Sequence, residues 1–179
     1  KRLIVVVGVI SRQSSSVVEA LLEYSDQWLV RCTTININSS YIQVFDLRFF
    51  FEGNYLFDCS IGTADRGVEI VLCDVSKREE CCQAFTGAYG VFSINKYWEA
   101  IDQDEYKQAV NLVEAARQAN VQHIITSGLP NTSAFDIEQT QIEDYIRALP
   151  QDSTFPYITF IQMGFYYQNF LTFFPPGSA

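Results

Sequence analysis

The chain has 179 residues, of which 48% are hydrophobic and 18% charged, and its formal net charge is −9. This length suits one domain with a real hydrophobic core, and the composition excludes a disordered tail or a collagen-like chain. A phosphate backbone is held by clustered positive charge, which this acidic chain lacks. We therefore expect no direct binding to nucleic acids.

The five cysteines and the single histidine, His123, offer no pattern typical of a metal site. Cys81 and Cys82 are adjacent and could in principle oxidise, but free cysteines usually behave as small buried hydrophobes, so we expect them to pack along a helix. The N-terminal run shows no signal-peptide pattern, and no segment reaches the ~18 apolar residues of a membrane helix. These features predict a reduced protein of the cytoplasm or nucleus that does not enter a membrane.

Apolar runs alternate with helical patterns along the first half of the chain. Within residues 1–10, Lys1 and Arg2 precede a continuous apolar run rich in β-branched residues, which indicates a strand buried on both faces. The serine cluster at 14–16 stands where a helix N-cap belongs, because apolar residues follow it at helical spacing. Residues 28–34 and 68–74 predict the next two strands, whereas 35–67 show no clear periodicity.

The same alternation continues in the second half. A capping-box pattern from Ser76 to Glu79 predicts the start of a short helix, and Gly87 is placed to end it. The clearest helix covers 102–119, with acidic residues in its first turn and one apolar face. The other predicted elements are strands at 88–94, 121–127 and 156–162, and a helix from Ser133 and Asp136 to Pro150.

Strands that alternate with helices over short connections favour right-handed βαβ crossovers. We therefore predict an α/β fold with a doubly wound parallel sheet, which is Rossmann-like with three α/β/α layers. In such folds the ligand crevice lies at the carboxyl ends of the strands, near the first βα turn.

Four segments, in this order and spacing, resemble the NmrA-like family of atypical short-chain dehydrogenases/reductases. They are VVVGVISRQSSSVVEALL, GVEIVLCDVSKREECCQAFTGAYGVFSINKYWE, EYKQAVNLVEAARQANVQHIITSGLP, and IEDYIRALP with PYITFIQMGFYYQNF. The resemblance implies an NAD(P)-binding domain over residues 1–162. Some members of this family are redox-sensing regulators that bind NAD(P) without turning it over, whereas isoflavone-reductase-like members reduce substrates with NADPH.

The family's phosphate loop reads G-x-x-G-x-x-G, and here only its first glycine remains. A serine in place of a glycine adds a Cβ near the expected pyrophosphate and disfavours a positive φ. Its hydroxyl can nevertheless donate to a phosphate, beside the free N–H groups of a helix N-terminus. We expect NADP or NAD to bind weakly or not at all; the alternative is a plain βα turn capped by Ser14. By resemblance, the cofactor-binding residues are Gly8, Ser11, Arg12, Gln13, Ser14, Asp74 and Ser93.

Cofactor preference and catalysis are poorly specified by this sequence. Ile35 stands where an arginine would hold a 2′-phosphate, and no acid replaces it to hold a free ribose. Asp74 either borders an adenine pocket, as the resemblance implies, or is a turn residue that leads into Ser76.

The catalytic pattern Y-x-x-x-K of short-chain dehydrogenases is not met. Gln139 stands at the position of the family's lysine, and Leu149 follows Tyr145 at the fourth position. Ser127 lies near the family's catalytic serine but proves nothing alone, and His123 reads as a structural histidine. We expect no catalytic residue and no hydride transfer.

Two segments depart from the family pattern. Residues 39–62 replace a short helix by a longer aromatic stretch, which is either a partner-binding insertion or non-native sequence such as a translated intron. Residues 163–179 resemble only the start of a substrate-binding part that is otherwise largely missing. We expect this tail to bind a protein partner or a second copy through Phe165, Tyr166, Tyr167, Phe170, Phe173 and Phe174.

Three functions remain open at this point. The leading hypothesis is a non-catalytic NAD(P)-binding module with a regulatory role. The second is an NADP-dependent oxidoreductase whose missing parts come from a partner subunit. The third is a degenerate product without a selected activity.

Overall fold

A computed structural model describes the backbone of six stretches of the chain. These are residues 1–8, 11–35, 67–94, 105–128, 137–150 and 157–164. The strands are β1 (Arg2–Val6), β2 (Trp28–Thr34), β3 (Val68–Leu72), β4 (Gly90–Ile94), β5 (His123–Gly128) and β6 (Tyr157–Gln162). The helices are α1 (Arg12–Glu23), α3 (Arg78–Phe85), α4 (Glu105–Gln118) and α5 (Ile137–Ala148).

The six strands form one parallel sheet in the order β3-β2-β1-β4-β5-β6. The chain leaves β1 toward one edge through β2 and β3, then returns to the other side of β1 and continues through β4, β5 and β6. The strand order therefore reverses between β1 and β4, and such a switch point leaves a crevice at the carboxyl ends of the strands. The predicted doubly wound, Rossmann-like fold is confirmed.

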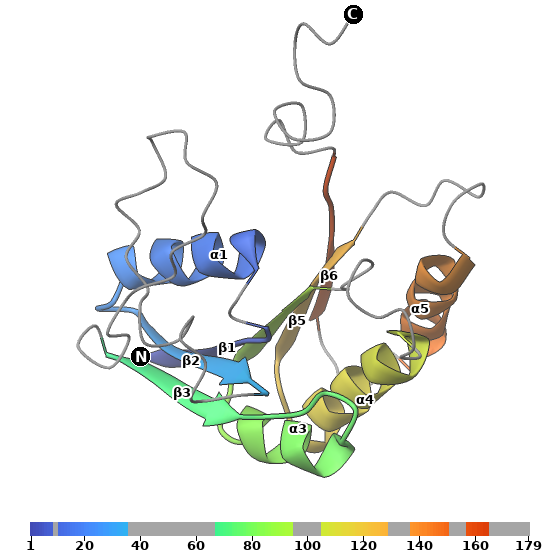
Figure 1. Cartoon of the computed structure of the whole chain (residues 1–179), viewed down its shortest axis with the longest axis horizontal. Helices are drawn as coiled ribbons and strands as arrows, with labels where there is room; N and C mark the ends of the chain where they lie inside the picture. The colour runs from blue at the N-terminus through green and yellow to red at the C-terminus, as the bar shows by residue number, and fades with distance from the viewer. Residues whose placement is uncertain (9–10, 36–66, 95–104, 129–136, 151–156, 165–179) are drawn as a thin grey trace, which may run out of the picture.

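Helices cover both faces of the sheet, as Figure 1 shows. Helix α1 packs on one face through Val18, against Val6 and Phe92. On the opposite face, α3, α4 and α5 share a second core that contains Phe85, Val113 and Ile146. The three α/β/α layers follow, and their two cores meet at β1, whose successive side chains enter opposite layers.

The prediction of where two helices begin is wrong by a few residues. Helix α1 starts at Arg12 with Ser11 as its N-cap, so the serines at 14–16 lie inside its first turns. Helix α3 has Lys77 as its N-cap, without a side-chain cap, and Ser76 does not cap it. Gly87, with φ +76°, does follow the end of α3 as expected, because the left-handed conformation suits glycine.

Several predictions concern residues outside the described ranges. The segment 39–62, the six aromatics of 165–179 and the helix start at Ser133 and Asp136 all lie there. Among the helices that the structure does describe, none combines the length and apolar character needed to cross a bilayer.

Candidate functional site

The candidate site begins where β1 ends, at the switch point of the sheet. The backbone N–H of Val7 donates to the carbonyl of Phe92 on β4, at 2.9 Å. The next residue, Gly8, has φ +72°, a conformation that side chains strongly disfavour. This glycine turns the chain away from the sheet and toward α1, as the first glycine of a phosphate loop does.

Two serines close the turn through their hydroxyl groups. The Ser11 oxygen accepts a hydrogen bond from the Ser14 N–H at 3.0 Å, and its hydroxyl donates to the Ser14 oxygen at 2.9 Å. The Ser14 hydroxyl in turn donates to the carbonyl of Val7 at 3.2 Å. Ser14 has no exposed surface, so it joins the first turn of α1 to the end of β1.

Neither serine adopts the positive φ that it would disfavour. Ser11 has φ −89° and ψ 153°, an ordinary extended conformation, and Ser14 lies within the right-handed helix α1. Among the described non-glycine residues, positive φ occurs at Asn120 and not at either serine. A buried hydrogen bond from Ser14 replaces the close helix–strand contact that a third glycine would provide.

The same hydrogen bonds reduce what the turn can offer to an anion. Free N–H groups at a helix N-terminus attract phosphate. Here the Ser14 N–H is satisfied by Ser11, and the Gly8 N–H donates to Thr33 Oγ1 on β2 at 3.3 Å. A bound pyrophosphate would have to compete with these hydroxyl groups. The remaining predicted loop residues, Arg12 and Gln13, occupy the first turn of α1, and the side chain of Arg12 is outside the described set.

The edge of the crevice next to β2 carries an exposed apolar residue. Ile35 directly follows β2 and is 74% exposed. Just before it, the Thr34 carbonyl accepts a hydrogen bond from the Cys73 N–H at 2.8 Å, which brings the ends of β2 and β3 together. Ile35 and Asp74 therefore follow adjacent strands at the same edge of the sheet.

Asp74 organises the turn between β3 and α3. Its Oδ1 accepts hydrogen bonds from the Ser76 N–H at 3.0 Å and the Ser76 hydroxyl at 2.7 Å. These bonds from Ser76 lower the pKa of the Asp74 carboxyl below its usual value. The Ser76 hydroxyl is thus bonded to Asp74, and the N-cap of α3 is Lys77 rather than Ser76. Glu80, in the first turn of α3, accepts a hydrogen bond from the Asp74 N–H at 2.8 Å.

Asn111 on α4 holds the same turn from the outside. Its side-chain amide donates to the carbonyls of Ser76, at 2.9 Å, and Val75, at 3.4 Å. Sequence reasoning missed this residue, since it lies 35 positions after Ser76 on the polar edge of a helix. No local pattern of the sequence marks it.

Ser93 does not join the turn residues. It is 5% exposed on β4 and lines a small cavity together with Thr126, Val113 and Ile142. Val113 and Ile142 belong to α4 and α5, so Ser93 faces the layer opposite to α1. The structure thus groups Gly8, Ser11 and Ser14, places Asp74 at the neighbouring strand end, and separates Ser93 from them.

Tyr145 is the tyrosine that was compared with the catalytic pattern Y-x-x-x-K, and it contacts a carboxylate on the neighbouring helix. Its hydroxyl donates to Glu114 Oε1 at 2.8 Å, and Glu114 is also paired with Arg78 and Arg117. Burial, and then the bond to Glu114, raise the pKa of Tyr145 to about 12. A tyrosine that donates protons in catalysis is tuned in the opposite direction.

Two further residues of the sequence analysis occupy structural positions. Ser127 is 1% exposed near the end of β5. His123 begins β5, where its Nε2 lies 2.9 Å from Thr159 Oγ1 on β6. Burial lowers the pKa of His123, which favours a neutral ring that bridges the two strands.

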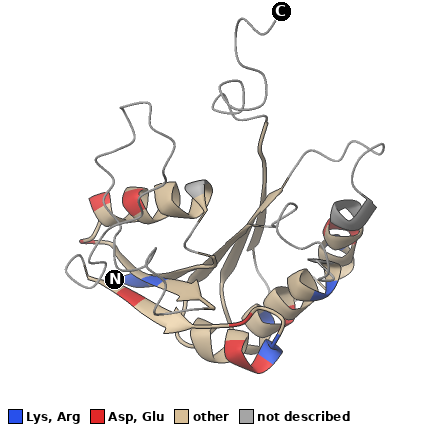
Figure 2. Ribbon diagram, viewed as in Figure 1, with Lys and Arg blue, Asp and Glu red and all other residues tan. Residues whose placement is uncertain are grey.

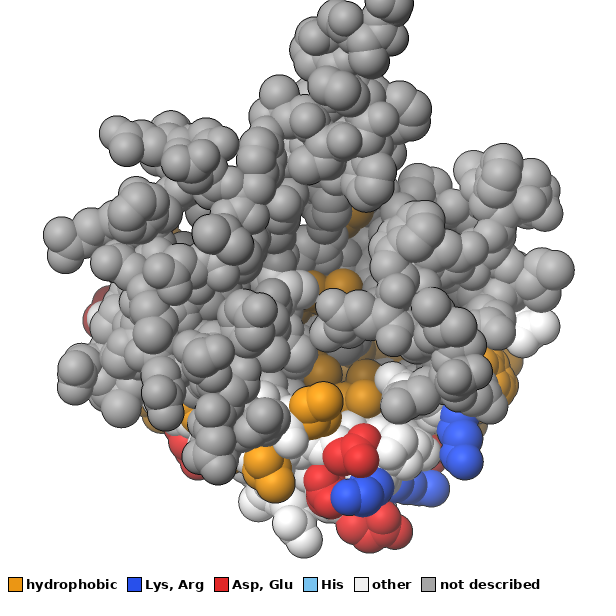
Figure 3. Space-filling view, viewed as in Figure 1, with side chains coloured by type: hydrophobic (Ala, Val, Ile, Leu, Met, Phe, Trp, Pro, Cys, Tyr) orange, Lys and Arg blue, Asp and Glu red, His pale blue; other side chains and the backbone are white. Residues whose placement is uncertain are grey.

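The described charges near α3 are balanced rather than basic. Lys77 pairs with Glu80 at 2.9 Å, and Arg78 with Glu114 at 3.3 Å. Figure 2 shows both signs along the ribbon of α3, whereas the charged positions coloured on α1 are acidic. In the space-filling view the acidic and basic groups lie side by side over α3 and α4 (Figure 3). This part of the surface offers no strongly positive field to a polyanion.

Comparisons with known proteins agree on a single family and fold. The sequence model of the NmrA-like family matches residues 1–178. An NmrA-like family domain-containing oxidoreductase, hkm9 of Aspergillus hancockii, is 27% identical over 95% of this chain and 48% of its own length.

Two solved structures share the fold. The triphenylmethane reductase of Citrobacter sp., solved with NADP(H), aligns with a TM-score of 0.67 and 23% identity over 94% of this chain and 51% of that one. NmrA, a negative transcriptional regulator solved with NAD, aligns with a TM-score of 0.66 and 21% identity over 94% of this chain and 47% of that one. The chain thus spans about half the length of the proteins that it matches.

Proposed function

Because this chain belongs to the NmrA-like family, we propose that it is a dinucleotide-binding domain that holds NAD or NADP weakly and acts as a regulatory or binding module. The dinucleotide lies at the carboxyl ends of β1 and β2, with its pyrophosphate at the Gly8–Ser14 turn and its adenosine near Ile35 and Asp74. Both NAD and NADP(H) are bound by structurally similar proteins.

The proposal of weak binding rests on the N-cap formed by Ser11. The Ser11 hydroxyl oxygen accepts a hydrogen bond from the Ser14 N–H, which is one of the groups through which a helix N-terminus holds a phosphate. A charge-assisted hydrogen bond contributes about 1.5–3 kcal/mol, so a lost donor weakens binding by tenfold or more. The exposed Ile35 adds no charge to select one cofactor.

The second candidate function is an NADP-dependent oxidoreductase. It is favoured by the names of similar proteins, which include an oxidoreductase and a reductase. Two features of this chain weigh against it. The Tyr145 hydroxyl is engaged with Glu114 and its pKa is raised, and Gln139 replaces the family's lysine.

One pair of assays separates the two functions. NAD, NADP and NADPH are titrated into the purified chain, and NADPH consumption is then followed with quinone and dye substrates at saturating cofactor. A regulatory module binds the dinucleotide and leaves NADPH unconsumed. Substrate-dependent consumption that exceeds a heat-treated control would instead establish the oxidoreductase.

A further inference from the structure

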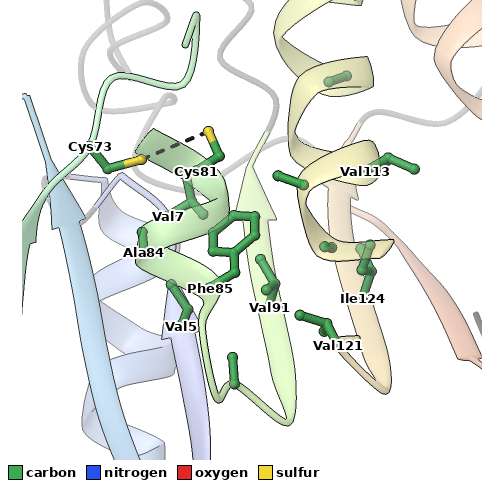
Figure 4. Packing of buried hydrophobic residues seen from close by; sticks show 14 of the residues in the cluster. Val5, Val7, Cys73, Cys81, Ala84, Phe85, Val91, Val113, Val121 and Ile124 are labelled. Carbon is green, nitrogen blue, oxygen red and sulfur yellow. Dashed lines mark hydrogen bonds between the residues drawn. The ribbon is translucent and has the colours of Figure 1, made fainter. Parts of the chain in front are cut away.

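Two buried thiols meet beneath the turn between β3 and α3. The Sγ atoms of Cys73 and Cys81 lie 3.8 Å apart, and the two residues are 2% and 0% exposed. Cys73 directly follows β3, and Cys81 lies in the first turns of α3, next to Phe85 (Figure 4). Sulfurs at this separation need to approach by only about 1.8 Å to reach bonding distance.

The turn between β3 and α3 lies against these thiols. Cys81 Sγ lies 3.9 Å from the carbonyl oxygens of Asp74 and Val75, so the turn passes directly over it. Ser76 and Lys77, in the same turn, are exposed. The turn is held by one backbone hydrogen bond, from the Lys77 N–H to the Asp74 carbonyl, and by side-chain hydrogen bonds, and not by a sheet ladder. Such segments open more readily than a buried core.

We propose that Cys73 and Cys81 form a redox-active dithiol, which hydrogen peroxide or an organic hydroperoxide oxidises to a disulfide that ties the β3–α3 turn to α3. This site goes beyond the proposed dinucleotide binding and does not depend on it. It lies at the same edge of the sheet as Asp74, so its closure repositions the turn that borders the crevice.

The reaction assigns different roles to the two sulfurs. The contact between the two sulfurs lowers the pKa of Cys73, whereas the same contact, together with burial, raises the pKa of Cys81. The Cys73 thiolate attacks one peroxide oxygen, so that an S–O bond forms while the O–O bond breaks and the leaving oxygen takes up a proton as water or alcohol. The Cys81 sulfur then attacks the Cys73 sulfenic acid, an S–S bond replaces the S–O bond, and the hydroxide leaves with the Cys81 proton as water. The dithiol loses two electrons and two protons, and the peroxide gains them.

The adjacent pair Cys81 and Cys82 is not the reactive one. Cys82 Sγ donates to Gln118 Oε1 on α4 at 3.3 Å. Cys32 is fully buried on β2, and burial raises its pKa to about 12, which keeps it a thiol. These two cysteines therefore serve as internal controls.

Peptide mapping tests the proposal directly in the full chain with Cys59 replaced by serine. Trypsin cleaves after Arg66, Lys77, Arg78 and Lys96, so Cys73 and Cys81 fall in separate peptides, 67–77 and 79–96. The folded protein is treated with hydrogen peroxide, alkylated in denaturant and digested without reductant. We expect the two peptides to be joined by a bond that dithiothreitol cleaves.

The matched variants sharpen this assignment. Cys82→Ser should retain the link between the peptides, because Cys82 takes no part in it, and Cys81→Ala should lose it. The proposal would be overturned if both cysteines were recovered in alkylated or over-oxidised form. It would also be overturned if the disulfide joined Cys81 to Cys82 within peptide 79–96. Because Cys82→Ser leaves one cysteine in each of the two peptides, a link in that variant joins Cys73 to Cys81.

Discussion

The Ser11 hydroxyl oxygen and the Ser14 backbone N–H form a hydrogen bond of 3.0 Å that caps helix α1 from within the candidate phosphate turn. The bond stabilises the helix and at the same time occupies a donor that a bound phosphate would use. A substitution that removes the Ser11 hydroxyl should therefore lower the stability of the helix and raise the affinity for a phosphate. The same opposition does not hold at Ser14.

Ser14 stabilises the fold and should not be replaced by glycine to gain affinity. Ser14→Gly removes the buried bond to the Val7 carbonyl and adds a glycine to a helix, so we expect a loss of about 2 kcal/mol in the free energy of unfolding. Urea denaturation measures the change. Ala20→Gly, at an exposed position of the same helix, is the control and should cost about 1 kcal/mol. Equal costs at both positions would show that the Ser14 bond contributes nothing.

Ile35 offers a way to install cofactor preference. Ile35→Arg places a guanidinium at the end of β2, where it can pair with a 2′-phosphate, so NADP should bind about fivefold more tightly while NAD changes little. Ile35→Asp should have the reverse preference, because its carboxylate accepts from a free ribose and repels the phosphate. Isothermal titration gives the dissociation constants of both cofactors. If neither variant changed the ratio of the NADP constant to the NAD constant, this placement of the adenosine would be contradicted.

His123 should make stability depend on pH in a narrow window. Its pKa in the folded protein lies below the ordinary value of 6.5, so the unfolded chain binds its proton more readily. This contribution to stability is complete above pH 6.5 and decreases as the pH falls toward the folded pKa. Thermal denaturation between about pH 5 and 7 should show the decrease, above the range where carboxyl groups titrate. His123→Gln should flatten the profile; an unchanged slope would mean that another group titrates.

Tyr145 is predicted to act in structure rather than in catalysis. Tyr145→Phe removes the bond to Glu114 and should cost about 1–2 kcal/mol of unfolding free energy. Tyr24→Phe, at a tyrosine that is 55% exposed, should change it little. Neither variant should alter dinucleotide affinity. A selective loss of NADPH consumption in Tyr145→Phe would reverse this assignment.

Local patterns were enough to predict the architecture. The unbroken apolar run of β1 requires burial on both faces, and the structure has Val5 and Val6 in different cores. The apolar face of α4, with Ala109, Val113 and Ala116, is buried as its spacing indicated. Such periodicities are properties of one segment, so they can be read without knowing its neighbours.

The site was predicted less well, because its contacts join distant residues. The spacing of Ser76 and Glu79 suggested a capping box, but α3 begins one residue later, with Lys77 as its N-cap, and Ser76 bonds to Asp74 in the preceding turn. The amide of Asn111 reaches this turn from another helix. Likewise, the 3.8 Å contact between Cys73 and Cys81 depends on how α3 packs against the end of β3, whereas the sequence drew attention to the adjacent Cys81 and Cys82.

The most direct test of the account is the NADP affinity of the intact chain and of Ser11→Gly, measured by isothermal titration on monodisperse protein. Glycine keeps the N-cap within a few tenths of a kcal/mol and frees the Ser14 N–H. We predict saturable binding to the unchanged chain with a Kd of about 100 μM or weaker, near −5.5 kcal/mol, and at least tenfold tighter binding to Ser11→Gly. A low-micromolar Kd for the unchanged chain, or an affinity that Ser11→Gly leaves unaltered, would contradict it.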